Sequence, residues 1–326
     1  MYTLPKDVRI GVLRGGPSPE YDVSLKSGAQ VLNVLSETHQ PVDILIDKAG
    51  VWHVRGTPRS PDRVLNHLDV VFNALHGTYG EDGIVQNILN HHAVPYTGSD
   101  RFSSAIAMNK WLTKEQARSA GIKTPISVVV RSTDSVIEKA REIFHSIPHP
   151  LVVKPTMGGS SLGIFVVKSF PELVSALESV LTVYDSALVE EYIAGKEATC
   201  TVVNDFRDRQ VYSFPPIEIR YPKPEMVWTY DHKYSGESQI MYPTTLLSGE
   251  TKAVEDMSRA IHSLLKLSHY SRSDFIVSPR RGVYFLEVNT LPGMTAHSLV
   301  PKSLESVGVT LKEFIHHIIG LALNKK

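Results

Sequence analysis

The sequence predicts an α/β domain built on a parallel sheet, followed by a larger α+β part. Three observations lead to this fold class. The first hundred residues alternate segments of strand and helix periodicity. The remainder contains strand pairs separated by turn residues, and a chain of 326 residues that is 42% hydrophobic can bury several cores. We therefore expect a globular protein of two or three closely packed lobes.

The first hundred residues fit a parallel sheet best. Strands are expected at 8–13, 42–46 and 70–72, and helices at 24–35 and 83–91. Strands that alternate with helices favour parallel pairing, and ligands bind such sheets at the carboxyl ends of the strands. Two polar loops, RGGPSPEYDVS and NALHGTYGEDG, fall at those ends. Both loops are therefore candidate binding sites.

The rest of the chain mixes helices with antiparallel strands. Strands are expected at 126–130, 151–154, 164–167, 188–193, 198–203, 210–214, 274–277 and 283–288. Helices are expected at 100–120, 135–147, 170–181, 251–267 and 310–323. The segment 215–248 is rich in Pro, Tyr, Gly and Ser and shows no clear periodicity. We expect a functional loop there, because its aromatic residues argue against disorder.

Composition excludes several classes of function. Lys+Arg and Asp+Glu both number 34, so the net charge of +0 creates no field that would gather nucleic acid or an anionic membrane. The single cysteine, Cys200, cannot form an internal disulfide, and its apolar neighbours predict a buried strand position. The N-terminal residues lack the apolar core of a signal peptide, and no run approaches the roughly 20 apolar residues of a membrane span. We expect a cytoplasmic protein without nucleic-acid or membrane partners.

A metal site is predicted near the C-terminus. Glu287 and Asn289 share one face of a strand, as do Arg272 and Asp274 on the preceding strand. If Asp274 lies opposite Glu287, two carboxylates and an amide oxygen converge, and such hard oxygen ligands suit Mg²⁺ rather than zinc. The alternative is a plain amphipathic strand with both groups in solvent. The apolar residues alternating with them, and the TLPGMT turn that can present N–H groups to an anion, favour the metal site.

The stretch KPTMGGSSLG, which starts at Lys154, predicts a main-chain cradle for an anion. Its glycines let N–H groups point inward, Ser160 and Ser161 add hydroxyl donors, and its lysine adds a point charge. The lysine precedes the glycines, which excludes a Walker-type loop. A glycine-rich hairpin with a surface lysine explains the stretch alone equally well. Lys110 and Lys233 could add phosphate charge, although each taken singly resembles an ordinary surface lysine.

Glu190 and Glu197 lie on either side of a possible adenine edge. They enclose a strand-like segment, and a strand edge can read adenine through backbone donors and acceptors. One carboxylate can accept from the exocyclic amine and another can take the ribose hydroxyls. The spacing permits this geometry without requiring it.

Nine motifs follow one another through nearly the whole chain. They are GGPSPEYDVSL, ALHGTYGEDG, PYTGS, AMNK, VVKPTMGGSSLG, LVEEYIAGKE, YDHKYSG, RSDF and LEVNTLPGMTAHSLVP. In this order they resemble the D-alanine–D-alanine ligases of the ATP-grasp superfamily. The resemblance implies a Rossmann-like N-terminal substrate domain at 1–100, a central ATP-grasp lobe at 101–186, and a C-terminal ATP-grasp lobe with an active-site loop and the metal site at 187–326.

The resemblance also implies roles for the residues at matched positions. The implied nucleotide contacts are Lys110, Lys154, Ser160, Ser161, Glu190, Glu197 and Lys233, with the main chain of Glu191 and Ile193 at the adenine. The implied ligands of Mg²⁺ are Asp274, Glu287 and Asn289, with Mn²⁺ as an alternative and two ions accompanying ATP.

Further matched positions concern the two substrate molecules. Glu20 resembles the carboxylate that holds the ammonium of the first D-alanine, with Val23 and His76 nearby, and Ser160 and Tyr234 match the pair that closes over the site with it. Arg272 and the N–H of Gly293 resemble the oxyanion site, and Ser298 and Leu299 resemble the seat of the second D-alanine's carboxylate.

The implied activity is the ATP-dependent joining of two D-alanine molecules through a D-alanyl phosphate, with release of ADP and phosphate, for peptidoglycan precursor synthesis. A carboxylate is a poor electrophile, so phosphorylation must activate it before an amine attacks. The acyl phosphate must be shielded from water, which the glycine-rich stretch and the aromatic loop would do as lids. The family also leads us to expect a homodimer.

Three positions depart from the family's common pattern: Met157 in the glycine-rich stretch, Tyr21 after the first-substrate carboxylate, and Trp228 in the aromatic loop. A ligase that makes D-alanyl-D-lactate or D-alanyl-D-serine is one alternative, and Lys233 with Tyr234 in DHKYSG favours the dipeptide over it. A regulator that lost turnover is another, but it would be expected to lose the predicted metal and oxyanion residues, which are all present. A plain α/β interaction protein leaves the ordered polar residues unexplained.

Overall fold

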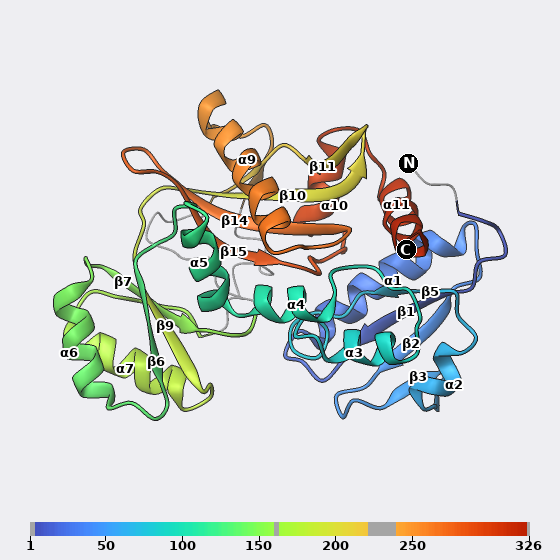
Figure 1. Cartoon of the computed structure of the whole chain (residues 1–326), viewed down its shortest axis with the longest axis horizontal. Coiled ribbons are helices and arrows are strands. Elements are labelled where there is room, and N and C mark those ends of the chain that lie inside the picture. The colour runs from blue at the N-terminus through green and yellow to red at the C-terminus, as the bar shows by residue number, and fades with distance from the viewer. Residues whose placement is uncertain (1–3, 160–162, 221–238, 325–326) are drawn as a thin grey trace.

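The chain folds around three β-sheets. The computed structural model describes residues 4–159, 163–220 and 239–324. Figure 1 shows the N-terminal sheet on one side, a sheet with two covering helices on the other, and the C-terminal sheet between and above them. The strand order is β4-β3-β2-β1-β5 in the N-terminal sheet, β6-β9-β7-β8 in the central sheet and β13-β12-β10-β14-β15 in the C-terminal sheet, where β11 also pairs with β10.

The N-terminal sheet is parallel in its centre, as predicted. Its strands are β1 (Ile10–Gly15), β2 (Val42–Ile46), β3 (Trp52–Val54), β4 (Thr57–Pro58) and β5 (Val70–Asn73). Strands β2 and β5 pair in parallel with β1, whereas β3 and β4 form an antiparallel extension at one edge. The associated helices are α1 (Tyr21–Ser36), α2 (Pro61–Leu65) and α3 (Ile84–His91). Sequence periodicity missed β3, β4 and α2 because each is five residues or shorter.

The central sheet is antiparallel and carries its helices on its apolar side. Its strands are β6 (Ser127–Arg131), β7 (Leu151–Pro155), β8 (Phe165–Val167) and β9 (Ser186–Glu191). Helices α6 (Val136–Ser146) and α7 (Phe170–Leu181) pack on it through one continuous hydrophobic cluster. The expected division between lobes at residue 186 falls at the first residue of β9, which pairs with β6 and β7 and so belongs to this sheet.

The C-terminal sheet carries the predicted hairpin and more. Its strands are β10 (Lys196–Phe206), β11 (Arg209–Ser213), β12 (Ile217–Arg220), β13 (Gln239–Met241), β14 (Tyr270–Ser278) and β15 (Gly282–Asn289), all paired antiparallel. Helix α9 (Ser248–Leu264) packs on it, and α10 (Leu299–Glu305) follows it. The expectation that 215–248 has no regular structure is wrong where β12 and β13 pair, because strands of three or four residues are too short to show a period.

The helical run expected at 100–120 is two helices, α4 (Arg101–Met108) and α5 (Lys110–Ser119). The helix breaks at Asn109, whose backbone is extended and whose side chain caps α5 by accepting from the N–H of Leu112. Ala107 and Ala117, one from each helix, join the hydrophobic cluster that includes Phe275 and Phe285 of the C-terminal sheet. The pair therefore connects the first sheet to the central sheet while packing on the last one.

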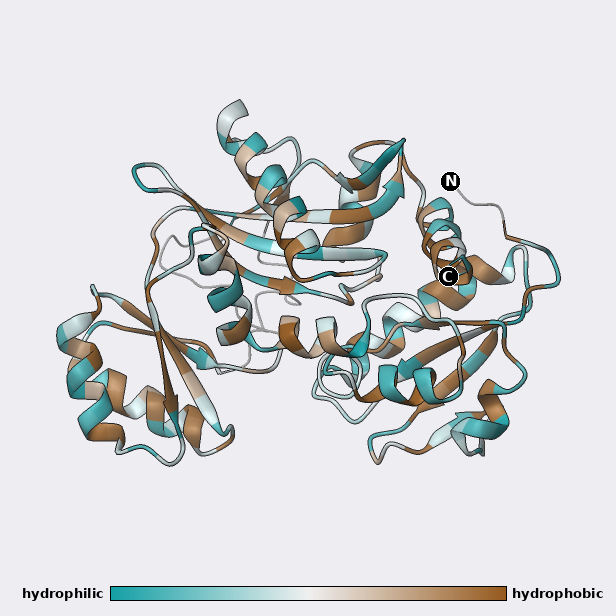
Figure 2. Cartoon of the chain, in the orientation of Figure 1, coloured by the Kyte–Doolittle hydropathy of each residue, from teal (hydrophilic) through white to brown (hydrophobic). Residues whose placement is uncertain are grey.

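The first and last parts of the chain share one core. Helix α11 (Leu311–Leu323) lies beside α1 (Figure 1), and its Phe314 and Ile318 join the cluster that holds Val12 and Phe72 of the first sheet and Phe206 of the last. Figure 2 shows the apolar colouring of these buried strands and of the inner helix faces. The shared core fixes the loops of the N-terminal sheet against the C-terminal sheet.

Two sequence expectations concern burial. Cys200 is fully buried on β10, where its thiol lies 3.3 Å from the carbonyl oxygen of Phe214, and burial raises the pKa of the thiol to about 12. A thiolate at neutral pH is thereby disfavoured, in agreement with a structural role. Among the helices of the described part of the chain, none combines the length and apolarity that crossing a bilayer requires.

The shared core yields a stability prediction. Replacing Phe314 by alanine removes a fully buried aromatic side chain from the junction of the first and last sheets, and we expect a loss of about 3–5 kcal/mol in the free energy of unfolding. Chemical denaturation followed by circular dichroism measures this, with the exposed Val183→Ala as a control. A loss no larger than that of the control would contradict the shared core.

Candidate active site

The β14–β15 hairpin places the three predicted metal ligands and Arg272 together. Asp274 pairs with Glu287 and Arg272 pairs with Asn289, so the register on which the predicted metal site depends is present. Arg272 donates from Nε and a terminal nitrogen to the two carboxylate oxygens of Asp274, at 2.9 and 2.8 Å. Burial works against the charge of Arg272, but the adjacent Asp274 carboxylate outweighs it and keeps the pKa of the guanidinium above its usual value. A fixed, permanently charged donor is therefore held at this point of the sheet.

The other two predicted ligands face the same region half-buried. The carboxylate of Glu287 lies 3.6 Å from the ammonium of Lys110, and the amide oxygen of Asn289 accepts from the N–H of Leu291 at 2.9 Å. Within the described residues, no three His, Cys, Asp or Glu side chains form a closed metal cluster. Two carboxylates and one amide oxygen instead fit Mg²⁺, which leaves other positions to phosphate and water.

Residues 157–159 of the glycine-rich stretch lie beside Glu287 of this hairpin. Lys110, at the start of α5, donates its N–H to the carbonyl of Thr156 at 2.9 Å and its ammonium to the carbonyl of Gly158 at 2.5 Å. Lys110, Lys154 and Glu287 line a cavity of about 20 Å³ beneath this stretch. That volume holds about one water molecule, so the cavity in this structure is too small for a ligand of nucleotide size.

Lys154 and Glu190 belong to a buried ionic group that also contains Lys114. The two carboxylate oxygens of Glu190 lie 2.7 Å from the ammonium of Lys114 and 2.7 Å from that of Lys154. Lys114 was missed by sequence reasoning, because nothing in KWLTKEQARS tells which lysine of a charged helix turns inward. Its spacing from Lys110, one helical turn, was the available signal.

The first-substrate residues come from loops at the carboxyl ends of β1 and β5. The carboxylate of Glu20 lies between Gly77 and Gly159, where a Cβ on either glycine would come within 2.7 Å of it. Three segments therefore meet at this carboxylate: the loop RGGPSPEYDVS after β1, the loop NALHGTYGEDG after β5, which is called the second loop below, and the glycine-rich stretch. Val23, on α1, is buried beside this corner. His76 lies in the second loop and is also buried.

His76 ties the N-terminal loops to the turn after β15. Its Nδ1 donates to the carbonyl of Leu291 at 2.8 Å, which leaves Nε2 to accept from the hydroxyl of Ser27, also at 2.8 Å. Ser27 in turn accepts from the N–H of Met294 at 3.2 Å. Burial lowers the pKa of His76, which favours this neutral tautomer. Ser27 was not singled out by the sequence because it lies among apolar helix positions.

The turn after β15 brings the remaining predicted residues together. A Cβ on Gly293 would lie 2.7 Å from the hydroxyl of Ser298, so only glycine fits this close approach. The Ser298 hydroxyl lies 2.7 Å from that of Thr295 and accepts from the N–H of Thr295 at 3.1 Å. Leu299 is buried at the start of α10 against Ile219. The oxyanion and second-substrate candidates are thus adjacent.

The adenine-side residues are only partly as expected. Glu191 donates its N–H to the carbonyl of Ile126, and its carboxylate is bound by Arg281 at 2.8 Å. The N–H of Glu191 is therefore already hydrogen-bonded and cannot donate to adenine. Of the main-chain groups of Glu191, the carbonyl is left as the predicted adenine contact. Ile193 is buried after β9, and Glu197 is half-buried on β10. Ser160, Ser161, Trp228, Lys233 and Tyr234 lie outside the described residues.

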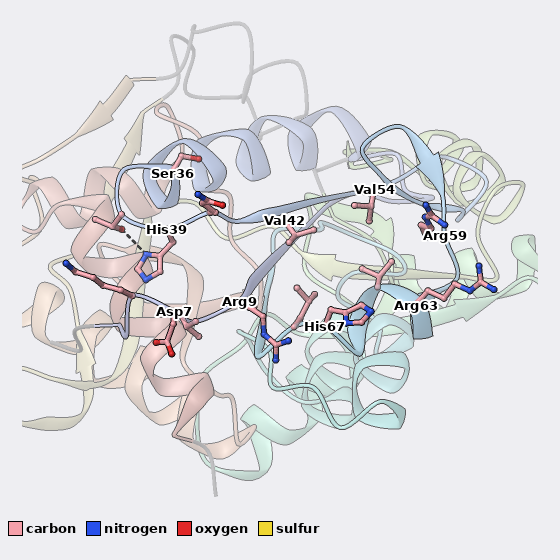
Figure 3. A pocket seen from close by; sticks show the side chains of 15 residues that line it. Asp7, Arg9, Ser36, His39, Val42, Val54, Arg59, Arg63 and His67 are labelled. Carbon is pink, nitrogen blue, oxygen red and sulfur yellow. Dashed lines mark hydrogen bonds between the residues drawn. The ribbon is translucent and has the colours of Figure 1, made fainter.

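A second hollow, of about 860 Å³, lies on the N-terminal domain and contains none of the predicted site residues. Figure 3 shows His39 towards one end of it, Arg59 and Arg63 towards the other, and Val42 between them. Arg9, also on its wall, is already paired with Asp69 at 2.6 Å. Of the two hollows, it is the smaller, covered one that is lined by predicted site residues, namely Lys110, Lys154 and Glu287.

A three-sheet fold that brings Lys110, Lys154 and Glu287 to one cavity beneath a glycine-rich segment, with Asp274 and Asn289 on the same hairpin as Glu287, defines an ATP-dependent ligase of the ATP-grasp class. A family model described as the D-ala D-ala ligase C-terminus matches residues 117–320, and one described as the D-ala D-ala ligase N-terminus matches residues 55–99. The D-alanine–D-alanine ligase of Geobacter sulfurreducens is 37% identical over 319 residues, which cover 96% of this chain and 94% of the relative. The chain belongs to the D-alanine–D-alanine ligase family.

Solved structures support the same fold. The D-alanine-D-alanine ligase from Coxiella burnetii superimposes with a TM-score of 0.84 at 26% identity, covering 98% of this chain and 95% of that chain. The VanG D-Ala:D-Ser ligase from Enterococcus faecalis superimposes with a TM-score of 0.83 at 30% identity, covering 97% and 99%. The predicted fold class, a Rossmann-like domain followed by a two-lobed ATP-grasp fold, is confirmed.

Glu81, which sequence reasoning did not single out, gives a prediction about pH. It is buried in the second loop, accepts from the N–H of Gly77, and has its pKa raised to about 8 by burial and by the nearby charge of Glu20. Because the folded-state pKa is raised, the stability from the protonated form is complete below about pH 4.5 and is lost as pH rises to about 8. Glu81→Gln stays neutral and should escape this loss.

Thermal unfolding of both proteins across this pH range tests the assignment. The melting temperature of Glu81→Gln should rise relative to the wild type as the pH increases, whereas Glu178→Gln, at an exposed position of α7, should run parallel to the wild type. Parallel curves for Glu81→Gln would show that Glu81 is ionised in the folded protein.

Proposed function

We propose that the chain joins two D-alanine molecules into D-alanyl-D-alanine, with conversion of ATP to ADP and phosphate, for peptidoglycan precursor synthesis. The observation that carries this proposal is that three kinds of group lie at the covered cavity or on the β14–β15 hairpin and turn beside it. These are cations for a triphosphate, oxygen ligands for a divalent ion, and a buried guanidinium beside a backbone turn. Separate substrate loops from the N-terminal sheet reach the same place.

The nucleotide would lie between the central and C-terminal sheets. Lys110 and Lys154 carry charge to its phosphates, while Glu190, Glu197 and the segment from Glu191 to Ile193 receive its adenosine. Asp274, Glu287 and Asn289 would hold Mg²⁺, or Mn²⁺, with a second ion arriving with ATP, and the bound ions neutralise charge on the transferring phosphoryl group. In the part of the chain described, these side chains already lie on adjacent strands or facing elements.

The first D-alanine would be activated beside the N-terminal loops. Glu20 binds its ammonium, and Val23 and His76 line the pocket around it. A carboxylate oxygen of this D-alanine attacks the γ-phosphorus of ATP, the bond to the β–γ bridging oxygen breaks, and ADP leaves. The neutral His76, held by Leu291 and Ser27, supports this position without adding a competing charge.

The second D-alanine would bind with its carboxylate at Ser298 and Leu299. Its amine, after losing a proton, attacks the acyl carbon and forms a tetrahedral oxyanion. Arg272 and the N–H of Gly293 stabilise that oxyanion, because both donors are held in place before the charge develops. Collapse of the intermediate expels phosphate and leaves the peptide bond.

Exclusion of water completes the proposed mechanism. The acyl phosphate hydrolyses readily, so the glycine-rich stretch must close again after substrate entry. The hydrogen bond from the ammonium of Lys110 to the carbonyl of Gly158 would stabilise the closed position of the stretch. Ser160, Lys233 and Tyr234, which the resemblance assigns to the same cover, lie outside the described residues.

The second substrate is the point at which related ligases differ. The VanG structure is titled a D-Ala:D-Ser ligase, so a hydroxyl-bearing second substrate is the alternative to test. Lys233 with Tyr234 in DHKYSG favours D-alanine, as argued from the sequence. We further propose a cytoplasmic homodimer, and lobes at 1–100, 101–186 and 187–326, as family membership implies. Strand β9, which crosses the boundary at residue 186, completes the sheet of the central lobe.

A product assay tests the proposed function. The purified protein is incubated with ATP, Mg²⁺ and a panel of D-alanine, D-serine, D-lactate and L-alanine, and products are separated by mass spectrometry. We expect ADP formation that depends on D-alanine, with D-alanyl-D-alanine as the main product. A greater yield of D-alanyl-D-lactate than of D-alanyl-D-alanine near neutral pH would contradict the dipeptide assignment.

The metal assignment gives a second prediction. Glu287→Gln keeps the size of a ligand but removes its charge, so turnover should fall about 100-fold or more and the Mg²⁺ concentration needed for half-maximal rate should rise. Glu305→Gln, at an exposed position of α10, is the matched control and should leave both unchanged. Undiminished turnover in a folded Glu287→Gln protein would remove Glu287 from the metal site.

A further inference from the structure

Three charged side chains from three elements meet out of contact with water. Lys114 on α5 has none of its surface exposed, Glu190 on β9 has 2% and Lys154 on β7 has 6%. Both ammonium groups lie 2.7 Å from a carboxylate oxygen of Glu190. One buried carboxylate therefore has two buried counter-ions, one more than its charge requires.

The two lysines differ in what else they can reach. Lys154 lines the cavity beneath the glycine-rich stretch, together with Lys110 and Glu287, whereas Lys114 does not line it. Within the described chain, Glu190 is the ion-pair partner of Lys114, and no other is found for it. Lys154 can therefore leave its ion pair with Glu190 and bind a ligand in the cavity, whereas Lys114 remains paired with Glu190.

The charges explain why one lysine must stay. If Lys154 turns to an anionic ligand, Glu190 keeps a partner only through Lys114, and leaving a buried carboxylate unpaired is strongly unfavourable. Burial works against the ionised form of Glu190, but the two ammonium groups keep the pKa of its carboxyl below the usual value. Burial, only partly opposed by Glu190, lowers the pKa of Lys114 to about 8.

We propose that Lys114 is a positioning residue of the nucleotide site, which keeps Glu190 ionised and oriented as an acceptor for the adenine amino group while Lys154 binds the phosphates. This inference rests on the proposed function for the identity of the nucleotide. An ionised carboxylate only accepts hydrogen bonds, so it favours the 6-amino group of adenine and repels the 6-oxo group of guanine. A carboxyl that has taken up a proton can donate to that oxo group. Lys114 therefore sets the preference for ATP over GTP without touching either.

The test compares nucleotide binding in Lys114→Met with the wild type. Affinities for ATP and for GTP, with Mg²⁺ and without D-alanine, are measured by isothermal titration calorimetry on the full chain. Loss of one charge-assisted contact should weaken ATP binding roughly 10- to 100-fold. GTP binding should weaken less, so that the ATP-to-GTP affinity ratio falls. Lys114→Arg should restore much of the ratio, and Lys139→Met, at an exposed helix position, should match the wild type.

Two outcomes overturn the proposal. One is an unchanged affinity for ATP in folded Lys114→Met, and the other is an equal loss for ATP and GTP, which a merely structural role would give. If Lys114→Met does not fold, Lys114→Gln removes the charge while keeping a polar contact, and the same ratio decides. The experiment needs no turnover, so a wild type that binds ATP but makes no D-alanyl-D-alanine would refute the proposed function and leave this inference standing.

Discussion

The active site depends on the hydrophobic core that the first and last sheets share. Phe314 and Ile318 of α11 pack with strand residues of both sheets, so the N-terminal loops cannot move away without opening that core. The hydrogen bonds from His76 to Leu291 and from Met294 to Ser27 then fix those loops to the turn after β15. These contacts hold the loops after β1 and β5 against the turn after β15, although some two hundred residues of sequence separate them. The loops and the turn are called the substrate corner below.

The central sheet supplies the covering half of the site. It carries Lys154 and Glu190 on its own strands, and its glycine-rich stretch reaches Glu20 on one side and Lys110 on the other. The covered cavity of about 20 Å³ is far smaller than a nucleotide, so the proposed ATP site requires this cover to open. The charges around the cavity are paired before any ligand arrives. Groups that are already in place can stabilise a developing charge with little reorganisation energy.

Much of this architecture could be predicted from the sequence, and the failures have physical causes. Alternating periods predicted the parallel sheet and the shared faces of Glu287 with Asn289 and of Arg272 with Asp274, because strand geometry fixes which side chains share a face. The register that pairs Asp274 with Glu287 was left open, since alternation within one strand does not set its alignment with the next. Lys114 and Glu81 were missed, since a helix or loop rich in charge does not reveal which charge tertiary packing will bury. The return of α11 to the first sheet was equally hidden, because an apolar helix face does not name its partner.

The central claim is that the carboxylate of one D-alanine is activated by phosphorylation at the substrate corner before the amine of the second D-alanine attacks it. The measurement that tests it most directly uses D-alanine labelled with ¹⁸O in its carboxylate, with ATP and Mg²⁺, and analysis of the released phosphate by mass spectrometry. The oxygen that bonds to phosphorus must leave with the phosphate, so each phosphate should carry one ¹⁸O atom for each dipeptide formed. Unlabelled phosphate, with the expelled ¹⁸O recovered in water, would contradict the acyl phosphate and with it the roles assigned to the site.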